Sequence, residues 1–249
     1  MLQRALKAEF MKLKHSPIWL AFILIPFISA FMGTFNYYGN REILTEEWYS
    51  LWTQHTIFYC YFCLPALIGI YCSYFCRLEN MNHNWKSLLA EPIPIRTVYF
   101  AKFLSIMSVI AMNQILIGVL FMISGKLMGF QSKFPISILG YLVMGTIASM
   151  AICAFQLTLS LIIRSFALPI GIALIGGIMS IAARAIGAPL ACWYSLFSVG
   201  MCANSPQTGL ECSLFTFLVM CSIFTGIFII SGIAYMGGTI PYIKAKMKM

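Results

Sequence analysis

The sequence predicts an all-α protein that crosses a membrane several times, and three observations support this. Of the 249 residues, 61% are hydrophobic and only 9% are charged, whereas soluble domains carry about 25% charged residues. Six apolar runs reach the minimum of about 17 residues that a helix needs to span a bilayer. The cations flank these runs, so the net charge of +9 is better explained by membrane orientation than by nucleic-acid binding.

The chain begins with a short amphipathic segment. Leu2, Leu6, Phe10 and Leu13 recur at helical spacing, with basic residues between them. No small-residue cleavage site follows a short apolar core, which argues against a signal peptide. We expect residues 1–17 to form an amphipathic helix, either lying on the membrane surface or extending into the cytoplasm ahead of the first span.

Six predicted spans follow this helix. They cover residues 18–35, 57–75, 103–124, 136–163, 166–183 and 214–236. Pro26 and Pro65 lie inside the first two spans and are expected to kink them, because proline has no backbone donor. Two pairs of small residues have the four-residue spacing that lets membrane helices approach closely. These pairs are Gly145 with Ser149 and Ala173 with Gly177.

The distribution of cations predicts the orientation. With the N-terminus in the cytoplasm, twelve cations fall on the inner side and four on the outer side. The inner cations are Arg4, Lys7, Lys12, Lys14, Arg77, Lys86, Arg96, Lys102, Arg164, Lys244, Lys246 and Lys248. The outer ones are Arg41, Lys126, Lys133 and Arg184. This bias predicts that both termini and the 76–102 segment are cytoplasmic.

Two sizeable loops are predicted on the outer side. The 37–56 loop is rich in aromatic side chains, which we expect to form an interfacial belt in preference to a ligand site. These side chains are Trp48, Tyr49 and Trp52. In the 187–213 loop, residues 189–200 are apolar enough for a short re-entrant or interfacial helix. A disulfide among Cys192, Cys202 and Cys212 stays open, because the count is odd and the geometry is unknown.

The 76–102 segment is the most polar stretch between two spans. Residues 80–90 can form a short amphipathic helix, which Pro92 and Pro94 would end. Its apolar face carries Trp85, Leu88 and Leu89. Such a helix suits docking onto another protein, although a solvated loop with a surface turn is the alternative.

Several kinds of chemistry are disfavoured. The Ser124-Gly125-Lys126 run lacks the upstream glycine and the following Ser or Thr of a phosphate-binding loop. No ionisable residue is expected at the centre of a span, which disfavours a proton- or sodium-driven carrier. Three amide side chains in the third and fourth spans could line a transport path or form interhelical hydrogen bonds. They are Asn113, Gln114 and Gln156.

A membrane-embedded metalloprotease is the rival class of function. The Glu46-Glu47 pair would need an arginine four residues later, but Leu51 stands there. The three histidines are expected at or outside span ends, on different sides of the membrane, where they could not share one metal ion. These histidines are His15, His55 and His83.

The 76–102 segment also carries a recognisable pattern, which consists of Glu79, Asn84-Trp85-Lys86, Leu88-Leu89, Pro92, Arg96, Tyr99 and Ala101-Lys102. This pattern resembles the intracellular loop of ABC-2 type transporter permeases. The likeness extends over the whole chain, residues 1–249, as a single transmembrane domain. It is strongest to the small permeases of lantibiotic-immunity and bacitracin-type peptide-resistance transporters.

The resemblance implies a permease subunit in the bacterial cell membrane, with no cofactor of its own. ATP and Mg²⁺ would be bound by a cytoplasmic ABC ATPase, expected as a dimer, and a second permease or another copy of this chain would complete the transporter. The helix at residues 80–90 would be the coupling helix, on which the ATPase docks. The docking residues would be Glu79, Trp85, Lys86, Leu88, Leu89 and Arg96. The implied cargo is an antimicrobial peptide. An ABC-2 permease for a lipid-like or drug cargo and a non-transport membrane scaffold remain alternatives.

Overall fold

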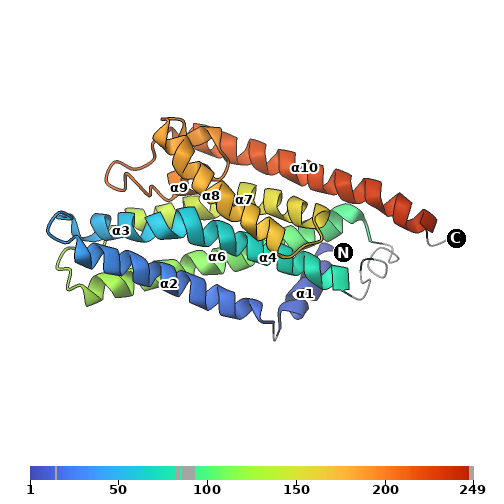
Figure 1. The fold of residues 1–249 in the computed structure, drawn as a ribbon, viewed down its shortest axis with the longest axis horizontal. Helices are drawn as coiled ribbons and strands as arrows, with labels where there is room; N and C mark the ends of the chain where they lie inside the picture. Colours follow the sequence, from blue (N-terminus) through green and yellow to red (C-terminus); the bar gives the residue numbers. More distant parts are fainter. Residues whose placement is uncertain (15, 82–84, 86–92, 247–249) are drawn as a thin grey trace.

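The computed structural model describes residues 1–14, 16–81, 85 and 93–246, with side chains as far as residue 238 (Figure 1). Among these described residues, six helices are long and apolar enough to cross a membrane, which confirms the predicted fold class. They are α2 (Ile18–Gly39), the continuous helix from Glu47 to Asn80, α6 (Ile95–Leu127), α7 (Ser137–Ile162), α8 (Ala167–Ala185) and α10 (Leu214–Lys246). In the part of the chain that the structure describes, every regular element is a helix.

The helices lie along one long axis, and both chain termini are at the same end of the bundle (Figure 1). We call this the N-terminal end. The short helix α1 (Leu2–Leu13) crosses the long axis obliquely there. Its partner in packing is α6. The indole Nε1 of Trp19, in the first turn of α2, donates to the carbonyl of Leu13 at 2.9 Å and so links the end of α1 to the start of α2.

The second span is longer than the sequence predicts. It consists of α3 (Glu47–Phe58), the π-helical turn η1 (Tyr59–Cys63) and α4 (Leu64–Asn80), 34 residues in all. At 1.5 Å per residue it is about 51 Å long, well beyond the ~30 Å hydrocarbon core, so its ends extend past the core or the helix tilts. The 76–102 segment is correspondingly shorter as a loop, since α4 reaches Asn80 and α6 begins at Ile95.

The π turn has a local cause in the sequence. Pro65 has no N–H to donate to the carbonyl of Tyr61, so the regular hydrogen-bond ladder is interrupted just where the turn lies. Gly177 of α8 packs directly against that carbonyl, and a Cβ at this position would collide with it. One turn earlier, Ala173 lies against Gly69 of α4. The close approach predicted for the Ala173 and Gly177 pair is confirmed.

Gly177→Ala is expected to destabilise the fold by about 1–3 kcal/mol, because overpacking forces the backbones of α8 and η1 apart. Gly171→Ala is the matched control on the same helix, since nothing lies within 4 Å of its Cβ position. Thermal unfolding of the purified protein, followed by size-exclusion chromatography, compares the two variants. Equal melting temperatures would contradict the tight contact.

The prediction of an interfacial aromatic belt is wrong for Trp48 and Trp52. Trp48 and Trp52 are only 7% and 1% exposed and pack inside the bundle against Phe121 of α6. Their indole groups donate to the carbonyls of Ser132 at 3.0 Å and Met201 at 2.8 Å. The 37–56 segment was predicted to be a loop, but residues from Glu47 onward are helical, and Ser50 and Thr56 are buried in the bundle with the two indoles.

His55 is a further correction. It is 2% exposed inside α3, not at the end of a span, and its Nε2 lies 2.9 Å from the Thr34 hydroxyl of α2. Gly33 makes room for it, because a Cβ there would meet the His55 backbone and ring.

Within the 187–213 segment, residues 194–203 are buried in the bundle. The segment contains the 3-10 turn η3 (Pro189–Ala191) and the short helix α9 (Ser195–Gly200), whose residues are all buried. This helix packs on α7, where Gly145 leaves room for the Met201 side chain. All nine cysteines of the chain are free in this structure. Burial raises the pKa of the Cys202 thiol to about 12, so that thiol is protonated at neutral pH.

Candidate functional site

Four charged side chains from three helices meet at the N-terminal end of the bundle. Lys102 of α6 lies at the centre, with its Nζ 2.8 Å from Glu79 Oε1 of α4 and 3.1 Å from Glu9 Oε1 of α1. Lys12, one turn beyond Glu9 on α1, pairs with Glu9 at 2.9 Å and also contacts Glu79. We call these four residues the charge cluster.

The local sequence explains how each member reaches the cluster. Glu9 lies on the side of α1 that also buries Leu13, so packing of α1 on α6 carries a carboxylate inward. Lys12 is on the same face, because residues three apart in a helix are neighbours. Glu79 belongs to the last turn of α4, and Lys102 lies two turns into α6.

The cluster is shielded from solvent and has no net charge. The Lys102 side chain is 1% exposed, those of Glu9 and Glu79 are 5% and 4% exposed, and only Lys12 reaches the surface. Removing such ions from water is costly, so each must be compensated by a close partner of opposite charge. Lys102 fulfils this by donating to both carboxylates. The cluster therefore fixes α1, α4 and α6 relative to one another.

Trp85 connects this cluster to the segment between α4 and α6. Its ring centroid lies 5.7 Å from Lys102 Nζ, within the range of a cation–π contact. Its indole Nε1 donates to Asn80 Oδ1 at 2.7 Å, at the end of α4. A displacement of Trp85 would therefore act on the same lysine that holds α1.

The structure brings together only part of the predicted docking set. Glu79 is in the charge cluster and Trp85 is against it, but Arg96 is exposed on the first turn of α6. The cation from α6 that holds Glu79 is Lys102, which the predicted docking set does not include. The predicted coupling helix over residues 80–90, including Lys86, Leu88 and Leu89, lies largely outside the described residues.

Sequence reasoning missed Glu9, Lys12 and the role of Lys102. One signal was available for Glu9, which is the only acid in the basic helix α1. An acid on the inward face of a helix that is otherwise basic requires a cation from another element. Nothing in the sequence specifies that this cation comes from residue 102.

A comparison with protein families identifies the chain. The model for ABC-2 family transporter proteins matches residues 5–180. The chain belongs to the ABC-2 transporter family. It is therefore the membrane-spanning component of an ABC transporter, a permease whose partner is an ABC ATPase subunit. Comparisons with curated proteins and with solved structures gave no match.

The permease also holds three amide side chains in its interior. Asn113 Nδ2 of α6 donates to the Tyr71 hydroxyl of α4 at 2.7 Å, and Gln114 Nε2 lies 4.0 Å from Met201 Sδ. Gln156 of α7 contacts the Tyr194 hydroxyl. The side-chain oxygens of Asn113 and Gln114 have no hydrogen-bond partner among the described residues. These amides remain candidates for a transport path or for interhelical contacts.

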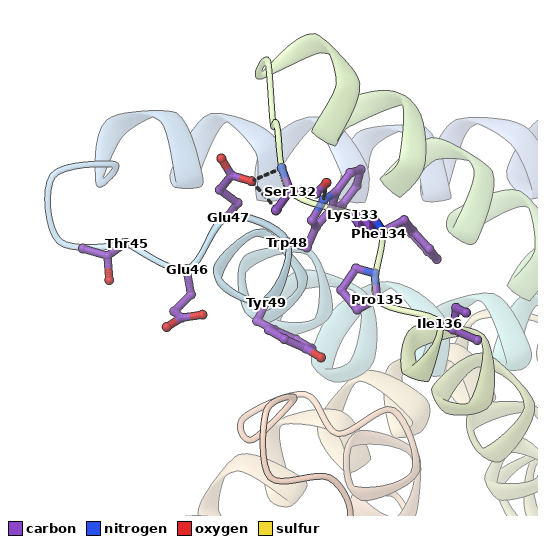
Figure 2. Close-up of a pocket in the computed structure, with 10 residues that line it drawn as sticks. All are labelled: Thr45, Glu46, Glu47, Trp48, Tyr49, Ser132, Lys133, Phe134, Pro135 and Ile136. Atoms are coloured by element: carbon purple, nitrogen blue, oxygen red, sulfur yellow. Dashed lines mark hydrogen bonds between the residues drawn. The ribbon is translucent and has the colours of Figure 1, made fainter.

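At the opposite end of the permease, a pocket of about 620 Å³ opens between two connections. Figure 2 shows the start of α3 on one side and the α6–α7 connection on the other. Glu47 accepts a hydrogen bond from the Ser132 backbone N–H at 3.0 Å and another from its hydroxyl, which ties the connections together. Glu46 points away from this pair in Figure 2. The walls combine two carboxylates, one ammonium from Lys133 and the Tyr49 ring.

Proposed function

We propose that this chain is the permease subunit of an ATP-driven exporter that removes amphipathic, cationic antimicrobial peptides of the lantibiotic type from a bacterial membrane. Membership of the ABC-2 family supports transport driven by a partner ATPase. The observation that carries the mechanism is the charge cluster, because it joins α1, α4 and α6 next to the segment where a partner could act.

The orientation is part of the proposal. The count of twelve cations against four supports a cytoplasmic position for the N-terminal end of the bundle, and with it for both termini and the 76–102 segment. A cytoplasmic ATPase dimer would dock on this segment through Trp85, Lys86, Leu88 and Leu89. A second permease, either homologous or another copy of this chain, would complete the transporter.

Motion would pass from the ATPase to the spans through direct contacts. When the ATPase subunits close on ATP, they displace the docked segment and with it Trp85. Because Trp85 contacts Lys102 and Asn80, the displacement reaches α6 and α4 together. Lys102 transmits it to α1 through Glu9.

The pocket at the opposite end supports a cationic, amphipathic cargo. Its two carboxylates outnumber its one ammonium group, and the Tyr49 ring and Ile136 supply apolar surface. In the proposed orientation the pocket opens at the outer face, where a peptide held in the outer leaflet could enter. A lipid-like or drug cargo would need less negative charge there.

The proposal predicts that export depends on ATP and not on the proton gradient. In cells expressing the permease with its ATPase, an uncoupler at constant ATP should leave the loss of a fluorescent lantibiotic from the membrane unchanged. Depleting ATP with the proton gradient kept should stop it. If the uncoupler stops export of the lantibiotic at constant ATP, the ABC mechanism is excluded. A complex that forms with the ATPase but exports no peptide, lipid or dye would identify a scaffold.

A further inference from the structure

The outward face of α1 carries a regular stripe of cations. Arg4, Lys7 and the C-cap residue Lys14 are its cations, and with Met11 between them they follow one another at spacings of three and four residues; all four are exposed. Such spacing keeps side chains on one face of a helix. The single acid of α1, Glu9, lies on the opposite, inward face, where Lys102 and Lys12 neutralise it. The outward face therefore presents positive charge with no acid of its own helix.

Apolar side chains share this outward side. Met11 is 61% exposed within the stripe, and Phe10 beside it is 42% exposed. A helix with lysine and arginine next to exposed apolar groups is suited to the boundary between lipid headgroups and acyl chains. The position of α1 agrees, because it ends only a few residues before the first span begins at Ile18 and crosses the bundle axis obliquely in Figure 1.

We propose that the stripe of Arg4, Lys7 and Lys14 binds the headgroups of anionic phospholipids, and that this binding holds α1 in place against the charge cluster. The two faces of α1 then have separate partners. The outward cations contact lipid phosphates, while Phe10 and Met11 enter the headgroup layer. The inward Glu9 contacts Lys102. Attraction of α1 to an anionic surface therefore favours the closed cluster.

An acidic protein surface, such as that of the ATPase, is the competing partner for the stripe. Two observations favour lipid. The helix that follows α1 in the chain exposes Leu20, Ile23 and Leu24 in its first two turns, as expected of a spanning helix that faces lipid. The stripe also lies on the side of α1 away from the cluster and Trp85, which is where the docked segment begins.

Hydrogen exchange of α1 in lipid nanodiscs tests this inference without ATPase or cargo. The permease is placed in discs of phosphatidylcholine alone or with one third phosphatidylglycerol. Each cation near an anionic surface increases the preference of α1 for its membrane-bound position about fivefold. Amide exchange over residues 2–13 should therefore be at least about tenfold slower in the anionic discs. High salt should remove the difference, because it screens exposed charges.

Two triple variants make the comparison specific. In the variant that combines Arg4→Gln, Lys7→Gln and Lys14→Gln, the amides of α1 should exchange equally fast in both kinds of disc. Arg41→Gln with Lys126→Gln and Arg164→Gln removes three exposed cations from other elements and should keep the lipid dependence. The inference is overturned if α1 of the normal protein exchanges equally fast in both kinds of disc. It is also overturned if the second triple variant loses the lipid dependence. So would protection of α1 in neutral discs that appears only when the ATPase is added.

A consequence for transport rests additionally on the proposed function. The rate of ATP hydrolysis by the complete transporter should rise with anionic lipid in the normal protein and not in the α1 triple variant. If α1 shows lipid-dependent exchange while hydrolysis does not change, lipid binding stands and only the coupling fails. If no ATPase associates at all, the proposed function fails and the exchange result is unaffected.

Discussion

Lys102→Met is expected to lower the free energy of unfolding by about 3–5 kcal/mol, the largest single effect that the structure predicts. The substitution keeps the length and apolar stem of the side chain but removes the ammonium group between Glu9 and Glu79. Both carboxylates then remain buried with Lys12 as the one cation of the cluster. Breaking a buried ion pair from one side typically costs this much, because a charge is left without compensation. Unfolding of the permease by sodium dodecyl sulfate in mixed micelles measures the difference.

Lys126→Met is the matched control, since Lys126 is an exposed cation near the other end of the same helix. It should change stability by less than about 0.5 kcal/mol, as is usual for surface substitutions. Adding Glu79→Gln to Lys102→Met should recover part of the loss, because one uncompensated charge is then removed. If the Lys102 and Lys126 variants are equally stable, the charge cluster does not hold the helices together.

Trp85→Ala is expected to reduce the affinity of the permease for its ATPase about thirtyfold, corresponding to ~2 kcal/mol. Aromatic anchors are the usual energetic centres of such contacts, and here the indole is already positioned by Asn80 and Lys102. The substitution should affect ATPase binding and cell protection together. The measurement is the ATPase recovered with tagged permease, divided by the amount of permease inserted in the membrane.

Trp85→Phe provides the comparison. Phenylalanine keeps an aromatic face over Lys102 but cannot donate to Asn80. It should therefore retain more ATPase than alanine does. If Trp85 is instead an anchor in the lipid interface, Trp85→Ala lowers the amount of inserted permease and leaves the ratio unchanged. An unchanged ratio would exclude the docking role.

The fold could be predicted because a membrane span is determined by a continuous stretch of sequence. Each of the six apolar runs has the length and composition of a bilayer-spanning helix, and the spacing of Ala173 and Gly177 predicted a close helix contact. The 47–56 segment was misread for a physical reason. Its aromatic side chains suggested an interfacial belt on an outer loop, but the bundle supplies carbonyl acceptors for the indoles of Trp48 and Trp52. Polarity in a membrane protein can face inward, and composition alone does not show which direction it faces.

The site was only partly predictable for a different reason. Glu79 and Trp85 stood out within one segment, where spacing and proline positions can be interpreted directly. The partners of Glu79 come from residues 12 and 102, which are distant along the chain. Charges that pair across helices leave no periodic signal, so the sequence singled out Glu79 but not the two lysines that contact it.

The separation between Glu9 and Lys102, 93 residues along the chain, also sets an order of events during synthesis. When α1 leaves the ribosome, its carboxylate has Lys12 as a local partner but no lysine from α6. Glu79 then emerges with the second span and is likewise without that lysine. The cluster can close only after the start of the third span has been made. The segment synthesised first thus lacks its α6 partner while two spans are inserted, and it can complete the cluster only when the third arrives.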